Sequence, residues 1–405
     1  MSKKRIFFIE TLLTHGVGHH LDNLIESTLF FKDNHKFDIN WLLNENFEKK
    51  NLYIPEKVKI YNLFSSKKDS NLKFLFRNFI FFFKYLFIFT KQRKFFYFFN
   101  AIIKNYFTIP FFFNLKACNF FLSQNFTNDD VIIIQSCRPK EVELINFLSF
   151  FFNEKPKIIL RILYPPKKNG LKNFYYFVDE LKKKGFIVKI FTEVETIKKY
   201  IMERSDYDIK NFTQIYDFYK RYNNSSFTIG FLGESRVDKG FNKLPDLIRL
   251  VLKKIQNVNI IIQFSEKIYP ETEKYKKEII ELSKFNRGIK IVNGYLDYFE
   301  YRKLLKEINI MPILYDADKL NFVGSGLFYS CITHEIPIII PKSASLIKND
   351  LQYKSFLEAN TVEEYADSIY KISKSYEFYL NECKKLSNYY KDKIYSDPLI
   401  KEVIN

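Results

Sequence analysis

Glycine and proline are scarce in this sequence, with 11 and 12 residues among 405. No low-complexity linker and no fixed-period repeat interrupts the chain, which argues against loosely tethered modules and against a repeat array. At this length a single hydrophobic core usually gives way to two domains of roughly 200 residues each. We therefore predict two closely packed domains, 1–222 and 223–405, with the boundary in the polar stretch 222–226.

Cysteine is also rare, and its four residues lie far apart without any Cys-x-x-Cys pair. This spacing argues against a zinc site and against a disulfide framework, and it fits a reducing compartment. The apolar run near the N-terminus is only a few residues long and ends at Glu10, so it predicts a first strand and not a signal peptide. We expect a cytoplasmic protein.

Acidic residues are missing between Asp69 and Asp129, in a stretch that is crowded with phenylalanine and punctuated by lysine and arginine. Its longest apolar run, 79–89, is broken by Lys84 and is shorter than the roughly 20 residues that cross a membrane. Two interpretations stay open for the segment at about 70–128. It is either a helical insertion that buries its phenylalanines in the N-terminal domain, or a surface that binds anionic lipid.

Positive charge exceeds negative charge, since 64 lysines and arginines face 46 acidic residues for a formal net charge of +18. Such an excess indicates an anionic partner. Charge alone does not distinguish nucleotide phosphates, nucleic acid and an acidic membrane surface as the partner, so the sequence motifs are needed to distinguish them.

Short β-rich runs alternate with helical patterns along both halves of the chain. This alternation predicts an α/β fold with two doubly wound, Rossmann-like domains, each a parallel sheet covered by helices on both faces. Pro245 suits the first turn of a helix, and the pairs Asp297 with Glu300 and Thr361 with Glu364 have the spacing of capping boxes. The predicted strands are 5–10, 36–44, 58–64, 131–136, 157–163, 186–193, 227–233, 258–265, 289–294, 308–315 and 336–341.

A glycine loop follows the first predicted strand and leads into an amphipathic helix. Gly16, Val17 and Gly18 allow close backbone approach, and the helix start offers N–H groups that suit a phosphate or a sugar hydroxyl. His19 and His20 come directly after this loop. We expect at least one of them to bond the reacting groups or the acceptor, with helix capping as the alternative.

The second half repeats this device in the loop that begins at Gly233. Arg236 can fork onto two phosphate oxygens and Lys239 can supply a point charge, a combination that suits a diphosphate leaving group. A solvated basic loop is the alternative. In the first half, Arg161 lies at the carboxyl end of a predicted strand, where open α/β sheets bind ligands.

From these loops onward the sequence resembles the retaining nucleotide-sugar glycosyltransferases, broadly glycosyltransferase family four (group 1), which have the GT-B architecture. Arg236, Lys239 and Gly240 are similar to the family's loop that holds the donor diphosphate, with Gly233 at its start. The glycine loop 16–18 resembles the acceptor-side loop of the family. The resemblance implies that the two loops face each other across a cleft between the domains.

Two later segments extend this resemblance. The run INIMPILYD resembles the strand that ends at the donor pocket, here with Tyr315. The run VGSGLFYSCITHEIPIIIP looks like the next helix and strand, which implies that Ser325 and Gly326 face the phosphates. Counted back from Pro337, the family's ribose-binding glutamate is replaced by Ser330, a shorter and neutral partner for a hydroxyl.

Two Asp-x-Asp triplets, 206–208 and 316–318, could hold a divalent ion that bridges a diphosphate. The architecture that the sequence resembles normally uses cations and a helix terminus instead. We therefore predict no essential metal and no cofactor, with Asp316 and Asp318 as the alternative.

The sequence thus predicts a hexosyltransferase-like enzyme that moves a sugar, with retention, from a nucleotide-diphosphate-sugar donor to a surface glycan or a lipid-linked acceptor such as a lipopolysaccharide core. Its main task would be to stabilise the departing nucleotide diphosphate. The predicted partners are the donor, a glycan or glycolipid and an anionic membrane surface, so that the protein would be peripheral on the inner face of the membrane; nucleic acid is not expected. Two rival functions remain, a nucleotide-sugar epimerase and a catalytically decayed module that binds nucleic acid or membranes.

Overall fold

A computed structural model describes most of the chain. The described residues are 4–13, 19–48, 52–64, 115–166, 168–219, 226–316, 325–342, 344 and 353–405. Several predicted features lie outside them, namely Gly16, Val17, Gly18, Asp318, residues 70–114 of the phenylalanine-rich segment and most of the boundary stretch at 222–226.

Seven parallel strands form the sheet of the first half, in the order β3-β2-β1-β4-β5-β6-β7. In β1, Ile6 and Phe8 point into one core while Phe7 and Ile9 point into the other. The strands read as continuous apolar runs because both faces of a parallel sheet are covered. Their bounds are β1 Arg5–Glu10, β2 Asp38–Asn44, β3 Lys59–Phe64, β4 Val131–Ile134, β5 Lys157–Ile162, β6 Val188–Thr192 and β7 Ile209–Asn211.

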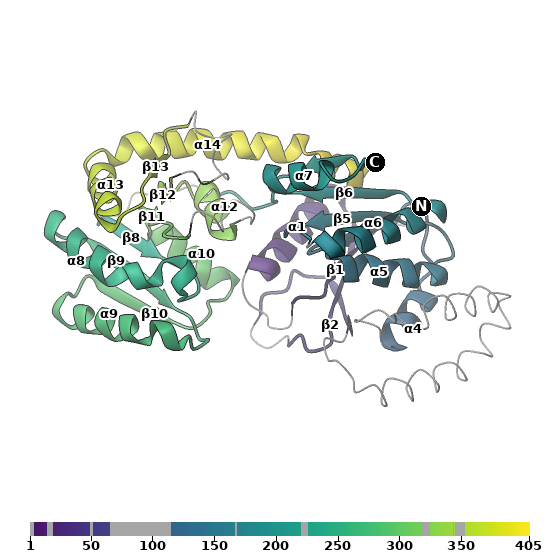
Figure 1. Cartoon of the computed structure of the whole chain (residues 1–405), viewed down its shortest axis with the longest axis horizontal. Coiled ribbons are helices and arrows are strands. Elements are labelled where there is room, and N and C mark those ends of the chain that lie inside the picture. Colours follow the sequence, from purple (N-terminus) through teal and green to yellow (C-terminus); the bar gives the residue numbers. More distant parts are fainter. Residues whose placement is uncertain are drawn as a thin grey trace.

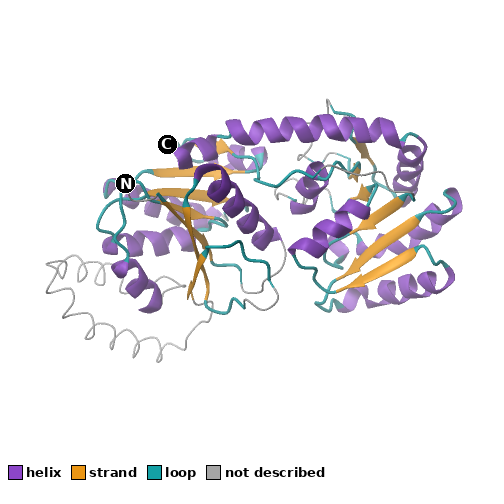
Figure 2. Ribbon diagram, turned by 180° about the vertical axis from the view of Figure 1, so that it is seen from behind, coloured by secondary structure: helices purple, strands orange, loops and turns teal. Residues whose placement is uncertain are grey.

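Helices cover both faces of this sheet (Figure 2). At the described end of the phenylalanine-rich segment, Phe120 and Phe121 are buried in the core on one face, while Lys116 is exposed. This end therefore follows the interpretation in which the phenylalanines are internal. The helices are α1 His19–His35, α4 Leu115–Ser123, α5 Pro139–Leu148, α6 Lys168–Lys183 and α7 Glu195–Met202, with a 3₁₀ turn at Ser149–Phe151.

The second half contains two three-stranded parallel sheets that continue one another. Ile229 of β8 forms a parallel bridge with Ile310, and the Gly230 amide donates to the Ile310 carbonyl at 3.0 Å. The combined order β10-β9-β8-β11-β12-β13 is that of a dinucleotide-binding fold. The prediction of two doubly wound units is thus confirmed. The strands are β8 Thr228–Phe231, β9 Asn259–Phe264, β10 Ile289–Asn293, β11 Met311–Pro312, β12 Ile338–Ile340 and β13 Phe356–Glu358.

The predicted helix starts of the second half are confirmed. Asp297 with Glu300 and Thr361 with Glu364 form capping boxes, and Pro245 lies in the first turn of its helix. None of the described helices is both long enough and apolar enough to cross a membrane. The helices are α8 Leu244–Lys254, α9 Glu273–Phe285, α10 Tyr298–Glu307, α12 Gly326–Thr333, α13 Val362–Lys374, α14 Tyr376–Ser396 and α15 Pro398–Ile404, with 3₁₀ turns at Val237–Lys239, Phe241–Lys243 and Pro270–Thr272.

The last two helices return the chain to the first half (Figure 1). α14 begins in the second-half core, which contains Tyr379, and its other end places Ile394 in the first-half core. α15 packs beside β7 and buries Leu399 against the first sheet. The predicted bounds 223–405 include α15 in the second domain, but the apolar face of this helix covers the first sheet. The two ends of the chain meet there, with Lys4 Nζ donating to the Ile404 carbonyl at 3.2 Å.

Candidate functional site

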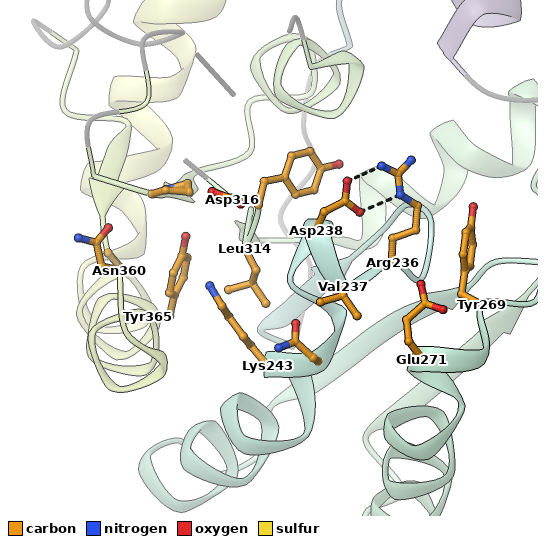
Figure 3. A pocket seen from close by; sticks show the side chains of 14 residues that line it. Arg236, Val237, Asp238, Lys243, Tyr269, Glu271, Leu314, Asp316, Asn360 and Tyr365 are labelled. Atoms are coloured by element: carbon orange, nitrogen blue, oxygen red, sulfur yellow. Dashed lines mark hydrogen bonds and ion pairs between the residues drawn. The ribbon is translucent and has the colours of Figure 1, made fainter. Parts of the chain in front are cut away.

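A pocket of about 690 Å³ lies at the carboxyl edge of the second-half strands (Figure 3). Its walls come from the loop after β8, from Leu314 and Tyr315 after β11, from Pro341 after β12 and from Asn360 before α13. Ligands of open α/β sheets bind at this edge. We therefore take the pocket as the candidate site of the second half.

The loop after β8 is anchored to the end of β9. The Ser235 amide donates to Ser265 Oγ at 3.2 Å, and the Ser265 amide donates to Ser235 Oγ at 3.0 Å. The Gly233 amide donates to Gln263 Oε1 at 3.0 Å. The predicted cations therefore project from a fixed backbone.

Gly240 ends the 3₁₀ turn of this loop, just before the turn that leads into α8. Its φ of 77° lies in the left-handed region that favours glycine. A Cβ at this position would lie 2.4 Å from the Leu314 carbonyl oxygen, so the loop passes too close to the end of β11 for any side chain.

Arg236 is paired with two carboxylates of its own loop. Its Nε donates to Asp238 Oδ1 at 2.8 Å, the second branch of the guanidinium contacts Asp238 Oδ2, and Nη1 donates to Glu234 Oε2 at 2.9 Å. The bond to Asp238 is the main cause that raises the pKa of Arg236, ahead of Glu234. Arg236 therefore keeps its charge at the pocket wall.

Lys239 is the second cation of the loop. Its Nζ lies 3.7 Å from Glu234 Oε2 and 5.6 Å from the ring centre of Tyr315. Burial lowers the pKa of Lys239. Burial would raise the pKa of Glu234, but Lys239 and Arg236 hold it below its usual value. An anion that entered here would compete with Glu234 for both cations.

The three predicted residues of α12 are not among those that line the pocket. Ser325 is the N-cap of the helix, and its hydroxyl accepts from the Phe328 amide at 3.3 Å, with Gly326 as the first helical residue. Ser330 is buried on α12, and its side chain is close enough to Tyr301 of α10 to affect the pKa of that phenol. The structure thus places Ser330 at the contact between these two helices.

His20 lies at the carboxyl edge of the first sheet. Its Nδ1 is 3.1 Å from Ser136 Oγ and 3.5 Å from Glu10 Oε2, and Ser136 Oγ donates to Glu10 Oε2 at 2.5 Å. Burial would raise the pKa of Glu10, but His20 and these hydrogen bonds hold it below its usual value. The backbone of His19 begins α1, and its side chain lies outside the described part of the chain.

Arg161 is buried in β5, two strands away from Glu10. Its Nη2 donates to Gln214 Oε1 at 2.9 Å, and its guanidinium lies 4.4 Å from the ring centre of Phe212. Burial lowers the pKa of Arg161, against the effect of Glu193 and Glu10. Burial raises the pKa of Glu193 to about 7, against the effect of Arg161.

Tyr164, two residues past β5, is affected electrostatically by residues of both halves. Burial raises its pKa first, and the carboxylates of Glu193 and Glu10 raise it further, while Arg236 of the second half acts in the opposite direction. Residues of both halves therefore act on one hydroxyl.

Asp316 lines the pocket, and its amide donates to the Asp238 carbonyl at 3.2 Å. Within the described part of the chain, no group of three His, Cys, Asp or Glu side chains has an arrangement that could hold a metal ion. Asp318, its predicted partner, lies outside that part.

The sequence analysis found the cations of the loop after β8 and of the carboxyl edge of the first sheet, but it missed the carboxylates beside them. Glu234 and Asp238 alternate with Arg236 and Lys239 in the printed sequence, and this alternation was the available signal for an ion-paired loop. Glu193 is the last residue of the predicted strand 186–193, and a place at the carboxyl end of a strand is the signal that had already singled out Arg161.

Solved structures with a similar fold cover nearly the whole chain. TarM matches with a TM-score of 0.62 and 12% identity over 100% of this chain and 99% of its own. HepE from Anabaena, solved with UDP and glucose, matches with a TM-score of 0.61 and 11% identity, over 96% of this chain and 95% of its own. Sucrose-phosphate synthase from Thermosynechococcus elongatus matches with a TM-score of 0.59 and 10% identity, over 97% of this chain and 95% of its own. No family model and no curated protein sequence matches the chain.

Proposed function

We propose that this chain, whose fold is that of the GT-B glycosyltransferases, transfers a sugar from a nucleotide-diphosphate-sugar donor to a glycan or lipid-linked acceptor. The observation that carries the proposal is the cationic loop of Arg236 and Lys239 beside the 690 Å³ pocket at the carboxyl edge of the second sheet. HepE has been solved with UDP-glucose, and a mutant of S. aureus TarM with fondaparinux, α-GlcNAc-glycerol and UDP. Both donor and acceptor thus have precedents on this fold.

In this proposal Arg236 and Lys239 bind the donor diphosphate, which takes the place of Glu234 on both cations. Asp238 then keeps the guanidinium oriented through its own pair of contacts. Negative charge grows on the diphosphate as the glycosidic bond breaks, and fixed cations stabilise that charge without reorganisation. The start of α12, with Ser325 and Gly326, is a third source of positive potential. Transfer with retention and without an essential metal completes the proposal.

The test is release of nucleotide from a panel of UDP-, GDP-, ADP- and dTDP-sugars by the full chain, with and without a chelator. Arg236→Ala should reduce the rate about a hundredfold or more, because it removes a preorganised charge. Arg249→Ala on α8 is the control, since Arg249 is exposed and paired with Asp246 and Glu278. Near-normal activity of Arg236→Ala would show that the phosphates bind elsewhere.

Product analysis separates the rival functions in the same assay. An epimerase would interconvert the donor sugar without releasing the nucleotide. A binding module would bind nucleotides or other anions and release nothing from any donor. Loss of activity in the chelator would favour a metal at Asp316 and Asp318.

We place the acceptor at an acidic membrane surface because the segment 70–128 contains no acidic residue. Each lysine or arginine near such a surface contributes about 1 kcal/mol. Flotation with acidic vesicles should recover the protein at low salt and less of it at high salt. Replacing Lys91, Arg93 and Lys94 by glutamine should weaken the attachment. A protein that stays unbound at low salt would place the phenylalanines in an internal core.

A further inference from the structure

Two carboxylates of α1 share one guanidinium where the two halves meet (Figure 1). Asp22 and Glu26 are four residues apart, so they lie on the same face of α1, and both approach Arg302 of α10. Arg302 and Glu26 are buried, and the side chain of Asp22 is 23% exposed. One positive charge therefore faces two negative charges at this contact, which we call the α1–α10 joint.

Arg302 gives its hydrogen bonds to groups other than Asp22. Its Nη2 contacts Glu26, its Nε donates to the Tyr219 hydroxyl at 3.0 Å, and its Nη1 donates to the Tyr298 carbonyl at 3.1 Å. Asp22 Oδ1 lies 4.0 Å from Nη1, beyond hydrogen-bond distance. Among the residues that the structure describes, the carboxylate of Asp22 accepts no hydrogen bond. Asp22 is therefore the carboxylate of the joint whose negative charge is least compensated.

The other titratable groups that face Asp22 are phenols. Tyr301 of α10 and Tyr216, which follows β7, both interact with its charge, and burial raises the pKa of each phenol. Both phenols are therefore neutral, and neither supplies a positive charge. Within the described chain, the charged groups that act on Asp22 are Arg302 and Glu26.

Charged side chains at the edge of the joint do not reverse this balance. Asp217 is exposed and raises the pKa of Glu26, so it adds negative charge. Lys306 is also exposed, and its Nζ lies over a neighbouring tyrosine ring, 5.1 Å from the ring centre. His20 is two residues before Asp22 on the helix, so it points in a different direction, and it contacts the edge of the first sheet.

Separation of the two helices would change the proton affinity of Asp22. In the docked protein burial raises its pKa from 3.8 to about 6, although Arg302 acts to lower it, and Glu26 raises it further. In water the carboxyl returns to its ordinary value. Between these two values the docked form holds a proton that the separated form releases. Docking is therefore favoured most below about pH 4, and this advantage is lost as the pH rises through about 6.

We propose that the α1–α10 joint is a proton-linked latch, in which Asp22 takes up a proton when the two halves dock and releases it when they separate. The latch needs neither donor nor acceptor, so it is independent of the proposed function. Because α1 also contains His20, the latch governs how firmly the carboxyl edge of the first sheet is held against the second half. The hold is firmest in acid and weakest above about pH 6.

Double electron–electron resonance between one spin label on each half tests the latch in the full chain. The labels are attached through Lys172→Cys on α6 and Lys277→Cys on α9, because both positions are exposed. Cys118→Ser provides the background, since the other three cysteines are buried. The ratio of separated to docked protein should rise about tenfold from pH 5 to pH 8, because the docked form titrates at about pH 6 and the separated form at about 3.8.

Asp22→Asn has no group at this position that titrates, so its distance distribution should be the same at pH 5 and pH 8. Asp22→Ala should behave in the same way, and it gives a second reading should Asp22→Asn fail to fold. The matched control is Asp246→Asn, because Asp246 is exposed and paired with Arg249 on its own helix, α8. The control should keep the tenfold change of the wild type.

A wild-type distance distribution that stays constant between pH 5 and pH 8 would overturn the inference. A pH-dependent change that persists in both Asp22 variants would also overturn it, because another group would then carry the proton. Loss of the change in the Asp22 variants alone, with the control unaltered, is the result that the latch requires.

Discussion

Glu193 shows how a single buried carboxyl couples the site to pH. Burial raises its pKa from 4.5 to about 7, although Arg161 and His20 act to lower it. Between these two values the folded protein holds a proton that the unfolded chain releases. The free energy of unfolding therefore falls as pH rises from about 4.5 to about 7, by roughly 2–3 kcal/mol for this group.

Replacing Glu193 by glutamine should remove this contribution, because an amide does not titrate. Urea unfolding at pH 4.5 and pH 8 should show a drop in stability that is smaller for the variant than for the wild type. Asp22, with a pKa raised by burial to about 6, gives a slope of the same sign in both proteins, so the difference between the curves reports on Glu193. Equal slopes in the two proteins would mean that Glu193 titrates normally.

At the scale of elements, the sequence predicted the strands that lie within apolar runs, including the short β11 and β12. It missed β7 (Ile209–Asn211) and β13 (Phe356–Glu358), because neither of these three-residue strands lies in such a run. The capping boxes of α10 and α13 could be read because they depend on residues three apart. The alternating charges of the loop after β8 indicated ion pairing, but not that Arg236 pairs with both Glu234 and Asp238, since that depends on how the 3₁₀ turn folds the loop.

At Gly240, a single added methyl group would displace the loop that carries Arg236 and Lys239. Gly240→Ala should lower stability by about 2 kcal/mol or more, because it combines a left-handed φ with a clash against the end of β11. Gly294→Ala is the control, since Gly294 has a φ of 80° and nothing within 4 Å of its Cβ position. Gly294→Ala should lower the free energy of unfolding by about 1 kcal/mol, because only the left-handed φ is unfavourable there.

Thermal unfolding gives both stabilities, and UDP binding shows the effect on the site. Gly240→Ala should also weaken UDP binding, whereas Gly294→Ala should not. Similar losses of stability in the two variants would mean that the loop moves away from Leu314 without cost.

At the scale of the whole molecule, a buried ion pair joins the two halves. Arg302 of α10 contacts Glu26 of α1, and the two residues are 7% and 2% exposed. Glu26 also accepts from the Tyr298 hydroxyl at 2.7 Å and from the Asp217 amide at 2.8 Å. Tyr53 stacks on Tyr298 with ring centres 5.2 Å apart. Because α1 contains both His20 and Glu26, this joint also fixes the first-half site relative to the second half.

Replacing Arg302 by methionine should lower stability by about 3–5 kcal/mol, because the carboxylate of Glu26 stays buried without its counter-ion. Adding Glu26→Leu removes that charge and should recover part of the loss. The recovery is incomplete because the Tyr298 hydroxyl and the Asp217 amide also lose their acceptor.

Urea unfolding of both single variants and of the double variant measures the coupling between Arg302 and Glu26. The control is Arg249→Met, at an exposed pair, which should lower the free energy of unfolding by less than about 1 kcal/mol. Turnover in the double variant should stay below that of the wild type, since an apolar contact no longer fixes the angle between α1 and α10. A double variant no more stable than Arg302→Met would show that the charge of Glu26 is neutralised by other means.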